Sequence, residues 1–408
     1  MAPEKISARC CIAGGGPAGM MLGYLLARAG VEVLVLEKHG DFLRDFRGDT
    51  IHPSTLEVMH ELGLLDEFLK LPHQKVYELN AQVGEVRLTV ADFRHLPTRC
   101  GFVAFMPQWD FLNFIAEKAA RYPGFKLMMQ AEVTGLIEES GRVVGVRAKT
   151  RNGMMDVRAD LVVGADGRSS LVREKAGLQV KEFGAPMDVL WFRLHRTAAD
   201  PAATMGRFAS GRIFIALNRG DYWQCGYVIA KGQFEEIRRR PFETFRAAIV
   251  DLAPYVTNSV QELRSWDNVK LLTVCVDRLL DWLRPGLLCI GDSAHAMSPV
   301  GGVGINLAVQ DAVAAANLLF EPLRQGQLAL DHLRRVQRRR ELPTRVTQWL
   351  QVAAQRRIIA PVLVETGPLK PPFAVRLLAK IPFLRRIPAR IIGLGIRPEH
   401  ITPELLRS

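Results

Sequence analysis

The chain has 408 residues, of which 48% are apolar and 24% charged, a composition typical of globular proteins and not of disordered ones. No secretory signal and no membrane-spanning apolar stretch are recognisable, and none of the six cysteines forms a CxxC pair, so we expect free, buried thiols in the cytoplasm. The net charge of +12 comes without any nucleic-acid-binding signature, and no nucleic-acid partner is predicted.

The predicted elements alternate between helix and strand at both ends of the chain, whereas strands dominate the middle. In chain order they are a strand at 8–13, a helix at 20–29, a strand at 31–37, a helix at 54–69, short strands within 76–98 and a helix at 110–121. Strands follow at 125–138, 142–150 and 153–164 and within 186–230, then a helix at 241–252, strands at 260–265, 270–276 and 287–291, a helix at 304–319 and a mostly helical basic stretch at 329–406.

This order predicts an α/β fold in which a Rossmann-like dinucleotide-binding domain is interrupted by a β-sheet substrate domain. Residues 1–75, 99–185 and 270–345 are assigned to the discontinuous dinucleotide-binding domain. Residues 76–98 and 186–269 are assigned to the substrate domain, and residues 346–408 to a helical, basic C-terminal segment.

The first glycine-rich turn has the GxGxxG pattern, formed by Gly14, Gly16 and Gly19. In such a strand–turn–helix unit the glycines allow a tight turn, backbone approach to a pyrophosphate and close helix packing. Glu37 ends the second strand, about 20 residues further on, where an acid binds the ribose of an adenosine. These features together predict dinucleotide binding.

Two further turns follow buried strands. The first contains Asp166 and Gly167, and by itself it is as readily structural as functional. The second begins at Asp292 and continues through a glycine-rich loop into a helix at Gly304. An acid, close backbone approach and a helix N-terminus together suit a flavin, which is anionic when reduced.

The three motifs, in this order, resemble those of the class A flavoprotein monooxygenases, the para-hydroxybenzoate hydroxylase-like family, over residues 8–345. The resemblance implies that the chain binds FAD and uses NADH or NADPH as a transient co-substrate, with the choice between the two left open. The residues that it assigns to FAD are Gly14, Gly16, Pro17, Ala18, Gly19, Glu37, Lys38, Arg47, Gln108, Asp166, Gly167, Asp292, Pro299, Gly302, Gly304, Ile305 and Asn306.

The resemblance also implies a reaction: NAD(P)H reduces the FAD, oxygen adds to form a C4a-hydroperoxide, and an oxygen atom passes to an aromatic, quinone-like or polyketide-like small molecule. Three alternatives stay open at this point. They are a reductase of prenyl or other double bonds, a flavin halogenase, against which the missing WxWxIP segment argues, and a non-catalytic flavin-binding protein.

Two histidines and a proline are the candidates for a catalytic role. His295 follows the Gly-Asp motif, and we favour a role in ordering the flavin loop over acid–base catalysis. His52 and Pro299 are weaker candidates, and loop packing is the preferred interpretation of His52. Neither histidine has a neighbour at metal-ligand spacing, so no metal site is predicted.

The substrate is expected between the flavin and the central sheet. The candidate residues there are Trp191, Arg193, Tyr222, Gln224 and Tyr227, each of them more readily structural than in contact with substrate. The oligomeric state does not follow from the sequence.

The C-terminal segment carries seven Lys or Arg and no Asp or Glu between Pro368 and Pro398, interleaved with apolar residues. This pattern suits either a helix packed on the protein, which we favour, or a helix lying in a membrane interface, which would place the protein peripherally at the membrane.

Overall fold

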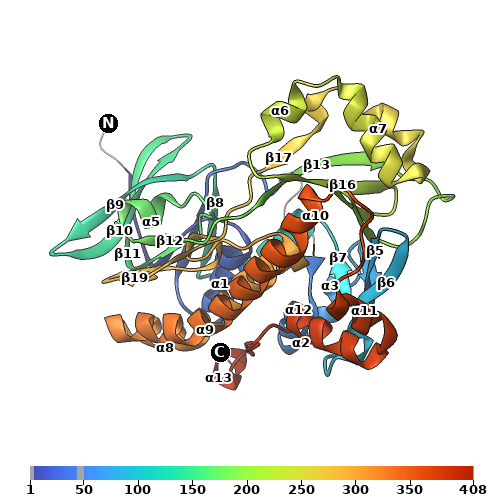
Figure 1. Cartoon of the computed structure of the whole chain (residues 1–408). Coiled ribbons are helices and arrows are strands. Elements are labelled where there is room, and N and C mark those ends of the chain that lie inside the picture. Colours follow the sequence, from blue (N-terminus) through green and yellow to red (C-terminus); the bar gives the residue numbers. More distant parts are fainter. Residues whose placement is uncertain (1–3, 44–49, 408) are drawn as a thin grey trace.

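The computed structural model describes residues 4–43 and 50–407. A large sheet and a seven-stranded sheet lie beside each other, and C-terminal helices run past both of them (Figure 1). The mixed α/β architecture expected from the sequence is confirmed.

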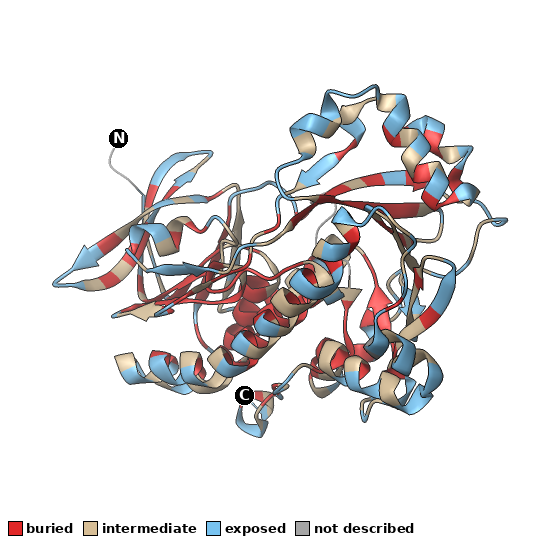
Figure 2. Ribbon diagram, viewed as in Figure 1, coloured by how far each residue is buried: buried red, intermediate tan, exposed pale blue. Residues whose placement is uncertain are grey.

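The eight-stranded sheet contains the predicted βαβ unit. β1 lies between β2 and β11 and is parallel to both. All five residues of β2 are buried, as is typical of a parallel strand covered on both faces (Figure 2). The strands are β1 (Glu4–Ala13), β2 (Val33–Glu37), β8 (Phe125–Met129), β9 (Glu132–Glu139), β10 (Arg142–Thr150), β11 (Gly153–Gly164), β19 (Leu283–Arg284) and β20 (Leu287–Cys289).

Three helices pack together on this sheet: α1 (Pro17–Arg28), α4 (Gln108–Ala119) and α8 (Gly304–Arg324). By length and composition α8 could cross a membrane, but most of its residues are buried inside the protein. It is therefore explained as a core helix, which must be apolar around most of its circumference.

The seven-stranded sheet has the order β17-β13-β16-β15-β14-β5-β6. The strands are β17 (Lys270–Leu272), β13 (Met187–His195), β16 (Tyr222–Ala230), β15 (Arg212–Asn218), β14 (Met205–Ala209), β5 (Glu78–Val83) and β6 (Val86–Asp92). The boundary placed at residue 270 is wrong, because β17 pairs with β13 in this sheet. A three-residue strand carries too little pattern to reveal its partner.

The two faces of this sheet are covered differently. Helices α6 (Phe234–Arg238) and α7 (Phe242–Leu252) cover one face, here called the helix-covered face. The opposite, inner face packs against α10 (Ala360–Val364) and against Val300 (Figure 1).

The C-terminal segment packs on several parts of the protein in turn. Helix α9 (Leu330–Ala354) contacts α8, and α10 reaches the inner sheet face. Helices α11 (Phe373–Lys380) and α12 (Arg386–Gly393) lie on β6, while Leu405 belongs to the core of the larger sheet. The segment is therefore integrated into the fold along most of its length.

All six cysteines are free, five of them buried, as expected. Burial raises the pKa of the Cys11 thiol to about 12, so this group stays protonated and unreactive near neutral pH.

Candidate functional site

The glycines of the first turn meet different surroundings. Gly14 has a φ of +108°, and a Cβ there would lie 2.3 Å from the carbonyl oxygen of Ala165. A Cβ at Gly19 would lie 2.0 Å from the carbonyl oxygen of Gly14. Among residues 4–43 and 50–407, and apart from its two chain neighbours, no atom lies within 4 Å of the corresponding position at Gly16. Two glycines thus permit close packing, and the third leaves open space.

That open space lies at the N-terminus of α1. Gly16 is the N-cap and no side chain caps the helix, while Pro17 occupies the first turn, which holds no acidic residue. Backbone N–H groups and the positive end of the helix dipole are therefore available to an anion. The turn fits a dinucleotide pyrophosphate.

Glu37 lies at the end of β2, beside this turn. Its buried carboxylate accepts hydrogen bonds from the N–H groups of Gly15 (2.9 Å) and His39 (3.0 Å). Lys38 is exposed next to it. The carboxylate is thereby held where an adenosine ribose would follow the pyrophosphate.

Asp166 and Gly167 follow β11, next to Gly14. The Asp166 carboxylate accepts hydrogen bonds from the Ser170 hydroxyl (2.5 Å) and the Val172 N–H (3.0 Å), and burial raises its pKa. Gly167 has a φ of +85°, which favours glycine. Asp166 thus orders the turn that leads into α5 (Leu171–Lys175).

The structure brings the second and third motifs together. The guanidinium of Arg168 donates a hydrogen bond to Asp292 at 3.0 Å, and both side chains are partly exposed. Gly291 lies against α1, where its Cβ would be 3.0 Å from the Cβ of Ala18. The three motifs, which are far apart in the sequence, thus converge around the N-terminus of α1.

The segment at 50–55 forms hydrogen bonds to the glycine-rich loop before α8 and to the start of that helix. Gly302 has a φ of +64°, and its carbonyl accepts a hydrogen bond from the Thr50 hydroxyl (2.8 Å). The amide oxygen of Asn306 accepts hydrogen bonds from the His52 N–H (2.9 Å) and the Thr55 hydroxyl (2.7 Å). In the part of the chain that the structure describes, no atom lies near the Cβ position of Gly304, and no side chain caps α8.

The other residues assigned to FAD lie in the loop before α8 and at the starts of α8 and α4. Pro299 precedes its 3-10 turn, Ile305 is buried in α8, and Gln108 opens α4 in a partly exposed position. Arg47 lies outside the described residues.

His52 is buried, and its Nδ1 lies 2.7 Å from the carbonyl oxygen of Ile392 in the C-terminal segment. Burial lowers the pKa of His52 to about 4, against the opposing effect of the hydrogen bond to that carbonyl. The ring is therefore neutral at pH 7 and donates Nδ1–H to the carbonyl oxygen. This placement supports the packing interpretation.

His295 belongs to a buried ionic network that orders the third motif. Its Nε2 lies 2.6 Å from Oδ2 of Asp311, and that oxygen also accepts the N–H of Gly291 at 3.0 Å. Oδ1 of Asp311 accepts from Arg340 (2.9 Å), which in turn pairs with Glu399 (3.2 Å). Burial opposes ionisation of Asp311, but His295 and Arg340 lower its pKa.

Sequence reasoning missed Asp311, Arg340 and Glu399. A lone acid in the apolar stretch of α8 is a signal that could have identified Asp311. Nothing in the sequence pattern links it to Arg340 in α9 or to Glu399 near the C-terminus.

The inner face of the seven-stranded sheet presents four of the five candidate substrate residues. Trp191, Arg193, Gln224 and Tyr222 share a face by the strand register, and the Arg193 guanidinium lies 4.8 Å from the centre of the Tyr222 ring. Tyr227 does not belong with them.

The prediction for Tyr227 is wrong, because this residue points to the helix-covered face and packs on Phe245, with ring centres 5.4 Å apart. The period of two along β16 separates it from Gln224 and Tyr222.

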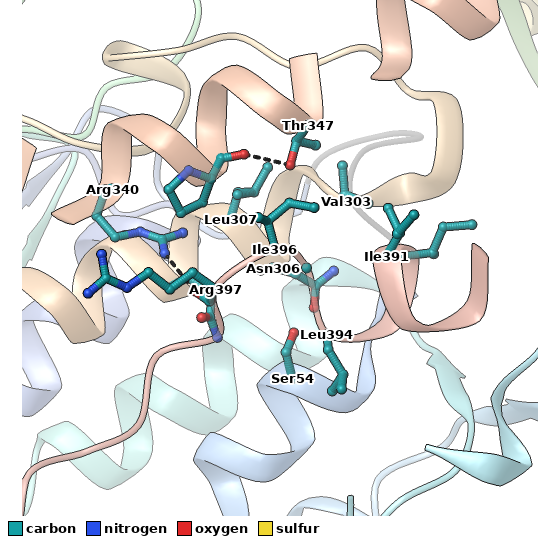
Figure 3. Close-up of a pocket in the computed structure, with 14 residues that line it drawn as sticks. Ser54, Val303, Asn306, Leu307, Arg340, Thr347, Ile391, Leu394, Ile396 and Arg397 are labelled. Carbon is teal, nitrogen blue, oxygen red and sulfur yellow. Dashed lines mark hydrogen bonds between the residues drawn. The ribbon is translucent and has the colours of Figure 1, made fainter. Parts of the chain in front are cut away.

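Two cavities differ in position. One of about 30 Å³ lies under the first turns of α8, between Asn306, Arg340 and Ile391 (Figure 3). It has room for water only, not for a substrate. The other, of about 290 Å³, is lined by Tyr227, Phe245 and Arg240 on the helix-covered face, away from the loop before α8. Within residues 4–43 and 50–407, no group of three metal-ligating side chains occurs.

An α/β domain with an open pyrophosphate site, a flavin-type loop and a second sheet beside it defines the class of FAD-dependent oxidoreductases. The family model described as "FAD binding domain" matches residues 7–349. The chain therefore belongs to this family, that of the class A FAD-dependent monooxygenases.

Relatives support this assignment. The 6-methylpretetramide 4-monooxygenase of Streptomyces rimosus is 33% identical over 388 residues, which cover 93% of this chain and 91% of that protein. The solved p-nitrophenol 4-monooxygenase of Pseudomonas putida has a TM-score of 0.78 at 20% identity, covering 97% and 100% of the two chains. The anhydrotetracycline hydroxylase of Streptomyces rimosus has a TM-score of 0.75 at 22% identity, covering 97% and 77%.

Proposed function

We propose that this FAD-dependent monooxygenase hydroxylates a polycyclic phenolic small molecule of the aromatic polyketide type. One observation carries the proposal: Val300, in the loop before α8, packs in the same apolar cluster as Trp191 and Ile215 of the inner sheet face. The flavin-type loop and this face therefore border each other. The name of the Streptomyces rimosus relative, 6-methylpretetramide 4-monooxygenase, supports a polycyclic aromatic substrate.

The residues of this chain have separable roles in the proposal. The N-terminus of α1 and Gly16 would hold the pyrophosphate, Glu37 would bind the ribose, and the loop at Gly301–Asn306 would border the flavin ring. FAD, reduced by NADH or NADPH, supplies the activation of dioxygen when bound. The inner face, with its apolar cluster at Trp191 and Ile215 and polar side chains at Arg193 and Gln224, would orient the substrate and exclude water.

Trp191 is the best candidate for a polar contact with the substrate. Its indole Nε1 is buried and has no hydrogen-bond acceptor among the residues that the structure describes. A buried donor without a partner is costly, so a substrate oxygen that accepted this N–H would bind favourably. Phenolic and quinone-like oxygens have this property.

The test uses the purified, FAD-loaded protein with NADH or NADPH and a panel of polycyclic phenols and single-ring phenols. We expect oxygen uptake that polycyclic substrates stimulate, with a product one oxygen atom heavier. Oxygen-independent reduction of a substrate would replace the proposal with a reductase. Turnover of single-ring phenols alone would overturn the proposed substrate class.

Trp191→Phe tests the role of the indole N–H separately. We expect kcat/KM to fall about 3- to 10-fold, the effect of one hydrogen bond of about 1 kcal/mol. Thermal stability should stay the same or rise, because the variant removes an unsatisfied donor. An unchanged kcat/KM would assign Trp191 to packing alone.

A further inference from the structure

The helices at the end of the chain expose an unusual group of large apolar side chains, here called the tail patch. Phe373 is 71% exposed, Phe383 64% and Ile387 55%. Leu377 and Ile381 complete the patch, which extends over α11, the 3-10 helix Pro382–Arg385 and α12. Single exposed apolar residues are normal on a monomer, but several of them on adjoining helices indicate an interaction surface.

The tail patch is held on an ordered scaffold. Ala389 of α12 is fully buried against Phe93 and Ala91, and Ile392 packs on Val303 and Leu307 beside the flavin-type loop. The guanidinium of Arg385 donates hydrogen bonds to the carbonyls of Leu378 (3.0 Å) and Ala379 (2.8 Å), which joins α11 to the turn that follows it. One side of these helices is therefore fixed on the protein, while the side chains of the tail patch are exposed. Much of the ribbon of α11 and α12 is coloured as exposed in Figure 2.

The segment that carries the tail patch is positively charged. The segment from Pro368 to Pro398 contains seven Lys or Arg and no acidic residue. Most of these cations are exposed, and the guanidinium of Arg386 lies 5.0 Å from the centre of the Phe383 ring. Exposed apolar side chains and flexible cations in the same segment match the two layers of a bilayer interface, in which acyl chains lie beneath anionic headgroups.

We propose that the tail patch binds the surface of an anionic lipid bilayer, with α11 and α12 lying in the interface. A second copy of this chain fits the patch less well, because a symmetric contact would bring the same cations of both copies together. The proposal does not rest on the substrate proposed above, since lipid binding requires no turnover.

The test is flotation of the FAD-loaded full chain with vesicles of phosphatidylcholine alone or of phosphatidylcholine with phosphatidylglycerol. We expect at least about tenfold more bound protein with the anionic vesicles, and less binding at high salt. Phe373→Ser with Phe383→Ser, and Arg376→Gln with Lys380→Gln, should each reduce binding several-fold. Unchanged far-ultraviolet circular dichroism and flavin spectra would show that these exposed changes leave the fold intact.

Matched controls lie on α9, where Leu342 is 58% exposed and Arg334 and Arg335 are exposed. Leu342→Ser and the pair Arg334→Gln with Arg335→Gln should bind anionic vesicles like the unmodified chain. Equal flotation of tail-patch and control variants would overturn the proposal. So would light scattering that shows a dimer which Phe373→Ser with Phe383→Ser converts to a monomer.

Discussion

At the scale of single residues, the first turn separates two uses of glycine. Gly14 is required by its own backbone, since its φ is +108° and a Cβ would overlap the Ala165 carbonyl. Gly16 has a φ of −75°, and apart from its chain neighbours no atom of the described residues lies within 4 Å of its Cβ position. Gly14 is therefore needed for the backbone conformation of the fold, whereas Gly16 leaves space for the ligand.

This difference predicts opposite outcomes for two similar changes. Gly14→Ala should lower the free energy of unfolding of the apoprotein by at least about 1–2 kcal/mol, the cost of a left-handed non-glycine residue. Gly16→Ala should change the free energy of unfolding of the apoprotein by no more than about 0.5 kcal/mol. It should raise the Kd for FAD roughly tenfold, because the new methyl group would occupy the space of the pyrophosphate. Chemical denaturation and FAD titration measure the two effects; equal FAD affinity in Gly16→Ala would contradict the assignment.

His52 makes stability depend on pH. Its pKa is about 4 when folded and near 6.5 when unfolded, so the unfolded chain binds the proton more readily. The contribution is fully present above pH 6.5 and is lost as the pH falls towards 4, by about 3 kcal/mol in total. In His52→Asn, the loss of unfolding free energy between pH 7 and pH 4 should be smaller by about that amount. Parallel pH profiles would show that His52 does not titrate in this way.

At the scale of elements, buried charges join helices that are distant in the sequence. Asp311 of α8, Arg340 of α9 and Glu399 form a chain of ion pairs, all with side chains no more than 4% exposed. Asp311 also accepts a hydrogen bond from the Gly291 N–H and pairs with His295. The end of the polypeptide is thereby connected to the Gly-Asp motif.

Removing one member of this ion-pair network should lower the free energy of unfolding, because it leaves a buried charge without its partner. Glu399→Ala should reduce the free energy of unfolding by about 3 kcal/mol. Glu404→Ala, an exposed change in the neighbouring helix α13 (Pro403–Arg407), is the control and should cost no more than about 0.5 kcal/mol. Equal denaturation midpoints for the two variants would show that the network adds little.

At the scale of the whole molecule, the proposed FAD site is assembled from distant parts of one fold. The first turn, the Asp166 turn and the loop before α8 come together around α1, and the C-terminal segment packs beneath that loop. A ligand that contacts all of these parts binds only the folded chain.

FAD should therefore stabilise the entire protein. At a concentration 100 times its Kd, the expected gain is about 2.7 kcal/mol, which raises the Tm of a chain of this length by several degrees. Differential scanning calorimetry against FAD concentration measures the effect, with riboflavin, which lacks the phosphates, as the control. A Tm that stayed constant while flavin absorbance reported binding would contradict this view of the site.

The sequence alone determined the fold class, the order of the motifs and the residues of the first turn. These depend on local chemistry: a buried strand, glycines at fixed spacing and a helix start are visible in neighbouring residues. Only the tertiary structure decided that Tyr227 faces α7, that β17 belongs to the second sheet, and that Glu399 and Ile392 support the site. Such contacts join residues far apart in the chain, and their energy depends on burial and distance, which residue order does not encode locally.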